Sequence, residues 1–526
     1  MGKIKRLFLF WLILTVTGGN VMSDNKPTNK YQQRADDWRI GAITYQVFVD
    51  RFAPARDLEA KRHLYPAPKS LRPWDELPKQ EAPSNDSILW THELAFWGGD
   101  LQSLAGKIDY IQSLGVDVLY LNPIVKAQSN HKYDAIDLMQ IAPEYGTLED
   151  LKTLASQLDK RNIQLVLDGV FNHVGFQSEW FQSALNDPES PYRNWFHFDD
   201  AIQNGYVGWW GVANLPELNW DNPDVQEAFL SKNDGIVRQY FNYGIDGWRL
   251  DVATELGFEY LRAITDAAEE EKSDALVIGE VWNYPKDWVN SLNAVMNFST
   301  RELMFRFVEN KLGGPQFTDQ LATQIRDADY EAILRSWLLI DNHDTPRLKT
   351  LYPDIQQQRM LQILQMTLPG SPLLYYGVEL GMEGGEDPEN RAPMRWDLNT
   401  NNNPEMAWLK KLIKLREENR ALKLGDFLPL TTQSALAFMR VTDRIEDTIA
   451  VVVNSSDKAI VETLMLRDPR IMNGDQFRDL LSDDVFPSRS GVMTLEIPAQ
   501  TAMIIKPDRW LERSKETGHS PYKHID

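Results

Sequence analysis

Four apolar runs in the sequence each have an acidic residue at or near the end of the predicted strand, close to histidine, arginine or glycine. These acidic residues are Asp168, Asp251, Glu280 and Asp344. Burying a charged side chain is costly unless it has a partner, so strands that end in this way differ from scattered surface acids. If the four runs are parallel strands of one barrel, their carboxylates meet at its C-terminal rim. We therefore expect one cavity lined by acidic side chains.

Carboxylates that share one cavity can cleave a glycosidic bond. One carboxyl group must be protonated to donate to the leaving oxygen, and a second must be ionised to attack the anomeric carbon or to activate water. A pocket of low dielectric constant with like-charged neighbours raises one pKa above the other. Arg249 stands two residues before Asp251 and can hold one carboxylate ionised. His173 and His343 can form hydrogen bonds with sugar hydroxyls.

Eight short apolar runs alternate with amphipathic segments from about residue 40 onward. The runs cover residues 42–48, 116–124, 165–171, 247–252, 276–282, 295–298, 338–341 and 372–376. One segment between them begins like a helix with a capping box, in which Thr147 pairs with Asp150. Another begins at Asn222, has proline at its first helical position, and places apolar residues as far as Tyr240 on one face. Eight strand–helix units in series predict an α/β fold, the (β/α)8 TIM barrel, and an open doubly wound sheet is the alternative.

Two long insertions and a change of pattern divide the chain. Residues 54–95 follow the first run. Residues 172–221, a segment rich in aromatic side chains, follow the third run and are expected to form a loop subdomain at the rim. The catalytic barrel is therefore expected over residues 40–424. Alternating apolar and polar residues over 425–507 predict a C-terminal antiparallel β-sandwich. The polar residues 508–526 predict a flexible tail.

The first residues of the chain have the pattern of an export signal. A short basic segment is followed by an apolar run at residues 7–16 and by small residues before position 24. The run is shorter than the roughly 20 apolar residues that a membrane span requires. We expect residues 1–23 to be a signal peptide, with an uncleaved anchor as the alternative. The mature protein is then expected to be periplasmic or secreted and to have no membrane span.

The composition excludes several classes of function. The chain has 526 residues, with 55 Lys and Arg against 76 Asp and Glu, which gives a formal net charge of −21. Such a chain repels phosphate backbones, and we find no basic patch, so nucleic acid is not an expected partner. The sequence contains no Cys, which excludes disulfides, zinc sites built on thiolates and cysteine nucleophiles.

Taken together, the four acidic segments resemble the four signature regions of glycoside hydrolase family 13, the α-amylase family. They read DGVFNH (168–173), GWRLD (247–251), GEVW (279–282) and DNHD (341–344). Further segments that resemble the family are GVDVLYLNP (115–123), HKYD (131–134) and YGVELG (376–381). The resemblance extends from about residue 40 to residue 507, in the expected order along the strand series.

The resemblance implies a role for each matching acidic residue. Asp251 would be the nucleophile that forms a covalent glycosyl intermediate. Glu280 would be the general acid and then the base of the second step. Asp344 would bind sugar hydroxyls and favour the distorted transition state.

The resemblance also implies a set of substrate-binding residues. They are Tyr133, His173, Arg249, His343, Asp387 and Arg391. Arg249 would pair with the nucleophile, and Tyr133 would stack on the sugar at the cleavage point. The two histidines would hold the hydroxyls of that sugar, and Asp387 with Arg391 would clamp the next sugar on the donor side.

Within the family, the chain is most similar to the group of neopullulanases, cyclomaltodextrinases and maltogenic amylases. That group usually carries an N-terminal sandwich domain used for dimerisation, whereas here the barrel is expected to begin near Ile40 and leaves no room for one. The fifth signature reads LPELN (215–219), which lies between the group's usual form and that of oligo-1,6-glucosidases. Bond preference and oligomeric state therefore stay open.

The same group has a calcium site that is only partly represented here. Gly98 and Asp100 match one half of it, and Asp57 is the candidate from the loop after the first strand. A calcium ion needs about six to eight oxygen ligands, more than these residues supply. The chemistry itself requires no cofactor.

The leading interpretation is a retaining hydrolase of α-glucan oligosaccharides that acts mainly on α-1,4 bonds of maltooligosaccharides, starch, pullulan or cyclodextrins. A transglycosylase with the same intermediate is one alternative, since water and an acceptor sugar compete for that intermediate. Hydrolysis of α-1,6 bonds is another alternative. A sugar-binding homologue that has lost catalysis is a third, because fold alone does not establish function.

Overall fold

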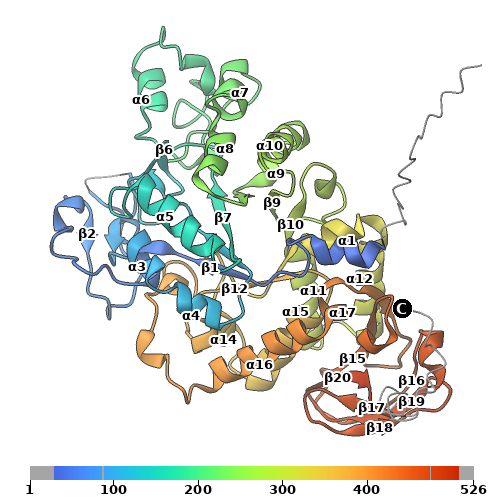
Figure 1. Ribbon diagram of the computed structural model, residues 1–526. Helices are drawn as coiled ribbons and strands as arrows, with labels where there is room; N and C mark the ends of the chain where they lie inside the picture. The colour runs from blue at the N-terminus through green and yellow to red at the C-terminus, as the bar shows by residue number, and fades with distance from the viewer. Residues whose placement is uncertain (1–28, 86–87, 474–475, 509–526) are drawn as a thin grey trace, which may run out of the picture.

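The computed structural model describes residues 29–85, 88–473 and 476–508. The predicted signal peptide, residues 1–23, lies outside the described residues, as does the predicted tail beyond Asp508. Most of the described chain forms a barrel surrounded by helices, and a second domain of strands follows it (Figure 1).

Eight parallel strands close into a barrel, which confirms the predicted fold class. In chain order they are β1 (Thr44–Val47), β4 (Val118–Leu121), β7 (Gln164–Gly169), β8 (Gly247–Leu250), β9 (Leu276–Val281), β10 (Ala294–Asn297), β11 (Trp337–Leu339) and β12 (Ser371–Tyr375). Each strand pairs with the next along the chain, and β1 closes the ring by pairing with both β4 and β12. Nearly every strand residue is buried, because helices cover the outside and side chains fill the inside.

Alternation along the strands brings the acidic residues to the rim of the barrel. Every second side chain of a strand points to the same face. Val166 of β7 and Ile278 of β9 belong to the apolar cluster inside the barrel. Asp168 and Glu280 follow them by two residues, so these carboxylates lie on the interior face at the C-terminal end.

Helices cover the barrel and its connecting loops. They are α1 (Lys30–Asp36), α2 (Val49–Phe52), α3 (Leu101–Ala105), α4 (Ile108–Ser113), α5 (Leu148–Asp159), α6 (Glu179–Asn186), α7 (Pro223–Leu230), α8 (Ile236–Gln239), α9 (Ala253–Leu256), α10 (Phe258–Glu271), α11 (Phe298–Val308), α12 (Gly314–Asp327), α13 (Tyr330–Arg335), α14 (Leu348–Leu351), α15 (Ile355–Thr367), α16 (Pro404–Glu418) and α17 (Arg420–Leu424). None of the helices within the described ranges has the length and apolar character needed to cross a bilayer.

Two of these helical segments test the sequence patterns directly. The capping box at the start of α5 is present, with the Thr147 N–H donating to the Asp150 carboxylate at 2.8 Å. The amphipathic segment from Asn222 to Tyr240 is two helices rather than one. The helix α7 ends at Leu230, and a turn in which Ser231 donates to Asp234 separates it from α8.

Segments inserted between the barrel strands form other parts of the rim. The insertion after β1 contains two short paired strands, β2 (Ser70–Leu71) and β3 (Ala95–Phe96). An antiparallel hairpin of β5 (Val125–Ala127) and β6 (Ala135–Ile141) follows β4 and was not predicted. The connection between its strands carries Tyr133. Residues 172–221 contain α6 and several isolated bridges, including Phe196 with Leu218.

The C-terminal domain consists of antiparallel strands, as predicted. Its main sheet has the order β13 (Asp426–Pro429), β14 (Leu436–Val441), β15 (Ile449–Asn454), β20 (Thr501–Pro507), β17 (Gln476–Asp479) and β18 (Val485–Pro487), and a second sheet pairs β16 (Ile460–Met465) with β19 (Val492–Ile497). Residues of both sheets, such as Val452 and Leu464, form one apolar core. The domain lies beside α12 and α17 of the barrel (Figure 1).

Candidate active site

One guanidinium group joins three carboxyl groups at the rim of the barrel. Nη1 of Arg249 lies 2.8 Å from Oδ1 of Asp168 and 2.8 Å from Oδ1 of Asp251. Nη2 of the same side chain lies 3.0 Å from Oε2 of Glu280, an ion pair without the alignment of a hydrogen bond. All four side chains are buried. Strands β7, β8 and β9 therefore bring together residues that are up to 112 positions apart in the chain.

The charges in this cluster do not balance. Three carboxyl groups contact one cation, so full ionisation would leave a net negative charge in a site from which water is largely excluded. Burial raises the pKa of Asp251 well above its usual value, and the Arg249 guanidinium opposes the rise, while Glu280 and Asp168 add to it. Three buried carboxyl groups around one cation therefore favour the binding of a proton within the cluster.

The backbone of Val252, next to Asp251, is strained, and its conformation places a hydrogen-bond donor beside the Glu280 carboxyl group. Val252 has φ 47° and ψ 39°, a left-handed conformation that is unfavourable for a β-branched residue. This conformation lets the Val252 N–H donate to Oε2 of Glu280 at 3.1 Å. Nε1 of Trp282 donates to the other oxygen, Oε1, at 3.1 Å, and its indole stacks on Phe298. The Glu280 carboxyl group is thus held on both oxygens.

Tyr133 and His343 form a stacked pair next to the cluster. Their ring planes differ by 8° and their centroids are 5.4 Å apart. The Tyr133 hydroxyl donates to Oδ2 of Asp168 at 2.9 Å and lies 2.5 Å from Nε2 of His343. Oδ2 of Asp168 also accepts from the Tyr120 hydroxyl at 2.6 Å. Burial lowers the pKa of His343 well below its usual value, so the ring is neutral.

His173 presents an unpaired nitrogen to the site. Its side chain is buried, and Nε2 has no hydrogen-bond partner among the described residues. Burial lowers the pKa of His173 to about 3, so the imidazole is neutral near pH 7. The ring lies beside Trp209 of the loop subdomain, with the centroids 5.9 Å apart. A buried polar nitrogen without a partner is costly, and a ligand hydroxyl would satisfy it.

Asp344 lies on the more open side of the network. Oδ1 of Asp344 is 3.2 Å from Nη2 of Arg391, whose Nη1 lies 3.1 Å from Asp387. Nε2 of His343 lies 3.2 Å from Oδ2 of Asp344. The side chain of Asp344 is 31 % exposed, against 10 % for Asp251, so it is the more accessible carboxylate. Arg391 thus connects Asp344 and Asp387, two of the predicted site residues.

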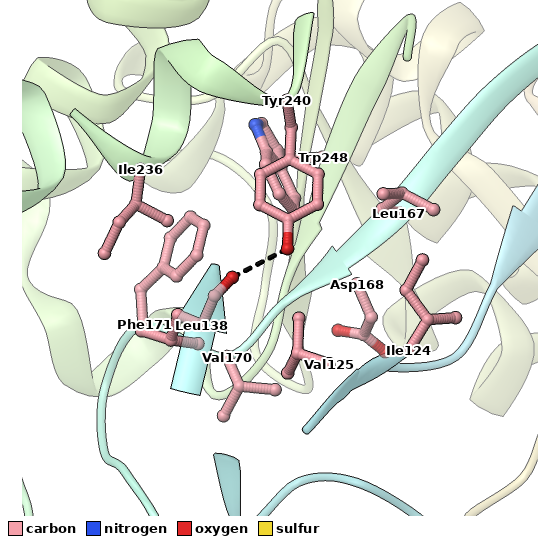
Figure 2. Close-up of a pocket in the computed structure, with 10 residues that line it drawn as sticks. All are labelled: Ile124, Val125, Leu138, Leu167, Asp168, Val170, Phe171, Ile236, Tyr240 and Trp248. Atoms are coloured by element: carbon pink, nitrogen blue, oxygen red, sulfur yellow. Dashed lines mark hydrogen bonds between the residues drawn. The ribbon is translucent and has the colours of Figure 1, made fainter. Parts of the chain in front are cut away.

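An apolar pocket lies behind the network and takes no part in it. Figure 2 shows its lining, in which Phe171, Tyr240 and Trp248 surround a space beside the base of Asp168. The Tyr240 hydroxyl donates to the backbone carbonyl of Leu138 at 2.6 Å. Asp168 is the only carboxylate in this lining, so the pocket supports the rim and is not a sugar site.

The predicted calcium ligands are already occupied by protein donors. Oδ1 of Asp100 accepts from the Ser103 N–H, and Oδ2 accepts from Nζ of Lys61 at 2.7 Å. The Gly98 carbonyl accepts from the Ala55 N–H. Asp57 accepts from the Ala60 N–H. Among the described residues no group of three or more acidic, histidine or cysteine side chains could hold a metal ion. The residues therefore do not fit a calcium ion in this arrangement.

Some parts of the network were missed by the sequence analysis. Tyr120 lies within a segment that resembles the family, yet no role was assigned to it. Gln46 of β1 was not noticed, although its side chain lies 2.9 Å from His343. The alternation of strand residues is the signal that could have placed these polar side chains inside the barrel.

Comparison with known proteins indicates the same family as the signature segments. Residues 46–423 match the family model described as "Alpha amylase, catalytic domain". A cyclomaltodextrinase of Geobacillus thermopakistaniensis is 33 % identical over 489 residues, which cover 91 % of this chain and 79 % of that protein. An intracellular maltogenic amylase of Bacillus subtilis is 34 % identical over 397 residues, 74 % of this chain and 64 % of the relative, less than two thirds of its length.

A solved structure extends the likeness to three dimensions. The cyclic α-maltosyl-(1→6)-maltose hydrolase of Arthrobacter globiformis has a TM-score of 0.73 and is 27 % identical. The match covers 88 % of this chain and 99 % of that one. These comparisons confirm the resemblance to the α-amylase family and to its cyclomaltodextrinase and maltogenic amylase group.

The comparisons also correct one prediction. A periplasmic or secreted location was expected from the N-terminal residues, but the relative from Bacillus subtilis is named as intracellular. The prediction of export is therefore wrong by this comparison. Its physical basis was a single apolar run next to basic residues, a pattern that depends on composition alone and lies outside the described residues.

Proposed function

Since the chain belongs to the α-amylase family of glycoside hydrolases, we propose that it hydrolyses α-1,4-glucosidic bonds of maltooligosaccharides and related α-glucans with retention of configuration. The observation that carries this proposal is the contact of Arg249 with three buried carboxyl groups. Retaining hydrolysis needs one carboxylate that attacks and one carboxylic acid that donates a proton. A cluster with more carboxyl groups than cations provides both states in one place.

The first step transfers the sugar to the enzyme. Asp251 attacks the anomeric carbon and forms a covalent glycosyl ester, while the glycosidic bond breaks and Glu280 protonates the leaving oxygen. Arg249 contacts Oδ1 of Asp251 and opposes the rise in the pKa of that carboxyl group, so it favours the ionised form, and Oδ2 is left for the attack. The contacts of Val252 and Trp282 orient the Glu280 carboxyl group.

The second step returns the enzyme to its starting state. Glu280, now a carboxylate, removes a proton from water, the water oxygen attacks the anomeric carbon, and the ester bond to Asp251 breaks. Two displacements at the same carbon restore its configuration. An acceptor sugar in the place of water would instead give a longer oligosaccharide.

The surrounding residues hold the sugar in this proposal. The stacked ring of Tyr133 provides an apolar face for the pyranose, and Nε2 of His173 meets a hydroxyl of the same sugar. Asp344 accepts hydrogen bonds from hydroxyls, and Arg391 keeps its carboxylate in position. Asp387, the most exposed of the three at 43 %, contacts the next sugar on the donor side.

The names of the relatives support the class of substrate. A cyclomaltodextrinase and a maltogenic amylase both act on α-glucans by name, which favours maltooligosaccharides and cyclodextrins for this chain. The name of the second relative likewise favours an intracellular location, where short oligosaccharides rather than granular starch would be the substrates.

The proposal is tested by the release of reducing sugar from maltotriose, pullulan and a cyclodextrin. We expect Asp251→Asn and Glu280→Gln each to lower kcat by at least about 10³-fold, because each removes a reacting group. Asp397→Asn, a change at an exposed carboxylate, is the matched control and keeps full activity. Activity in Asp251→Asn equal to that of the wild type would reject the assignment.

The products from pullulan then decide the bond preference. Panose or isopanose results from cleavage at one of the two α-1,4 bonds, and maltotriose results from cleavage at the α-1,6 bond. Products longer than the substrate would identify transglycosylation through the same intermediate.

A further inference from the structure

Gln46 occupies the centre of a buried polar chain beneath the proposed sugar site. The residue lies on β1, and its side chain is fully buried. Nε2 of Gln46 is 3.1 Å from Oδ1 of Asn122 and 2.9 Å from Nδ1 of His343. Gln46 lies within β1, Asn122 directly follows β4, and His343 lies in the loop after β11. A single amide thus joins parts of the rim that are 76 and 297 positions away in the chain.

The positions of the hydrogen atoms in this chain follow from the acceptor at one end. Oδ2 of Asp168 accepts from the Tyr133 hydroxyl, so the proton of that hydroxyl is committed to Asp168. The Tyr133 oxygen must then be the acceptor in its other two contacts. It accepts from Nδ2 of Asn122 at 3.0 Å, and the His343 nitrogen 2.5 Å away must therefore carry a proton.

The contacts of Gln46 at the other end of this polar chain lead to the same assignment. Because Nδ2 of Asn122 faces Tyr133, its Oδ1 faces Gln46 and must accept from Nε2 of that residue. An amide nitrogen has two protons and no acceptor site. The second proton of Gln46 Nε2 therefore points to Nδ1 of His343, which must accept it and cannot carry a proton of its own.

We propose that Gln46 is a positioning residue that holds His343 as the neutral tautomer with its proton on Nε2. This proton is directed at the Tyr133 oxygen and lies 3.2 Å from Oδ2 of Asp344, so the tautomer connects the stacking ring with the exposed carboxylate. The inference rests on the proposed function in one respect, namely that a sugar occupies the space beside these side chains. The opposite tautomer would place a lone pair of Nε2 against oxygen atoms of both residues.

The carbonyl oxygen of the Gln46 side chain supports the same role. Oε1 of Gln46 is buried and has no hydrogen-bond partner among the described residues. An unpaired buried carbonyl lowers stability, so an apolar residue of similar size would suit the barrel interior better. The amide is explained by what its nitrogen does, which is to donate to two acceptors. Burial, together with Arg391 and Arg249, keeps the pKa of His343 low and agrees with a neutral ring.

The tautomer can be read directly by NMR spectroscopy of the full chain labelled with ¹⁵N in histidine. The two ring nitrogens of a neutral histidine give distinct shifts for the protonated and the unprotonated site, and His343→Asn identifies the signals. We expect an unprotonated Nδ1 and a protonated Nε2 for His343 near neutral pH. A protonated Nδ1 in the wild type would overturn the proposal, whatever the enzyme's activity.

Gln46→Glu provides the second arm of the test. A carboxylate accepts and does not donate, so we expect Nδ1 of His343 to become protonated in this variant. The accompanying loss of geometry at Tyr133 and Asp344 is expected to lower kcat by about 10²-fold. An unchanged Nδ1 signal in the folded variant would contradict the proposal. If this variant does not fold, Gln46→Leu removes the donor without adding charge. The spectrum of the wild type still shows which nitrogen of His343 carries the proton.

The matched control is Gln365→Glu, which changes a buried glutamine of α15 that donates to the carbonyls of Leu338 and Leu373. We expect a lower melting temperature but unchanged His343 signals and kcat, because Gln365 does not contact the network. A lack of α-glucan hydrolysis by the wild type would reject the proposed function and leave the NMR result to stand by itself.

Discussion

The guanidinium of Arg249 performs two tasks at the residue scale. It fixes the relative positions of Asp168, Asp251 and Glu280, since each of the three carboxyl groups contacts one of its nitrogens. It also limits how many of them can be ionised together, because one positive charge faces three acids. The relative positions of the three carboxyl groups and the number of protons that they hold therefore both depend on Arg249.

We predict that Arg249→Met lowers the free energy of unfolding by about 3–5 kcal/mol at neutral pH, because it leaves buried carboxylates without a cation. In the variant, the folded-state pKa values of Asp168 and Asp251, which burial already raises, rise further above their unfolded values of about 4. The deficit is therefore small below that pH and grows as the pH rises. Melting temperatures at about pH 5 and pH 8 measure the difference.

Arg306→Met is the control for this prediction. Arg306 is 55 % exposed and pairs with Glu302 one helical turn away, so its removal is expected to cost less than about 0.5 kcal/mol at either pH. A deficit in Arg249→Met that did not change with pH would mean that lost packing, and not unpaired charge, is the cause.

His173 gives a prediction about pH dependence of activity. Burial lowers the pKa of His173 to about 3, so the residue is neutral from about pH 5 upward and does not titrate in the working range. We expect His173→Asn to reduce kcat/KM for maltotriose by about 10- to 100-fold through the loss of a buried hydrogen bond to the sugar. The acidic limb of the pH profile should stay in place. A shift of that limb would show that His173 does titrate during catalysis.

At the scale of elements, sequence patterns predict what depends on neighbours in the chain. The eight barrel strands were recognisable because burial on both faces demands continuous apolar runs. The half-exposed strands β17 and β18, four and three residues long, carry too few alternations to be recognised. The turn that separates α7 from α8 was missed because the apolar spacing continues across it.

The features that the sequence did not predict depend on contacts between segments that lie far apart in the chain. The signature acids could be assigned to one site because a parallel barrel brings strand ends together whatever the loop lengths. The partners of Gln46 and Lys61 depend on how individual loops close over the rim. Lys61 reaches Asp100, 39 positions away, and nothing in the spacing of the two indicates a contact.

The loop after β1 gives a prediction about metal removal. Nζ of Lys61 donates to Oδ2 of Asp100 and, at 2.6 Å, to the backbone carbonyl of Glu144. These contacts fasten the loop to the start of α3 without a metal ion. We therefore expect a chelator to leave the melting temperature of the wild type unchanged, and Lys61→Ala to lower stability by about 1–3 kcal/mol.

Lys458→Ala is the control for the lysine, since Lys458 is an exposed residue of the C-terminal domain. Thermal unfolding with and without chelator and added calcium measures both effects. A chelator-dependent fall in the melting temperature of the wild type would show that calcium, and not the ammonium group, holds the loop.

At the scale of the whole molecule, the C-terminal domain is joined to the barrel by buried polar contacts as well as apolar ones. Arg440 of β14 is fully buried and donates to the backbone carbonyls of Thr367 and Gly425. These carbonyls belong to the end of α15 and to the segment after α17. A guanidinium that donates to carbonyls at the ends of helices fixes the orientation of the two domains. We infer that the second domain stabilises the wall of the barrel.

A close backbone approach between the domains gives the last prediction. Gly314 begins α12, and a Cβ atom added there would lie 2.2 Å from backbone atoms of Ala435 and Leu436 at the start of β14. Backbone cannot yield as a flexible side chain can, so Gly314→Ala must push the domains apart. We expect a loss of about 1–3 kcal/mol or more, and a melting transition that separates into two. Gly106→Ala is the matched control, because its added Cβ would meet the nearest atom at 3.3 Å. Scanning calorimetry of both variants distinguishes the outcomes: if Gly314→Ala melted in one transition at the temperature of the wild type, the domain contact would contribute nothing to stability.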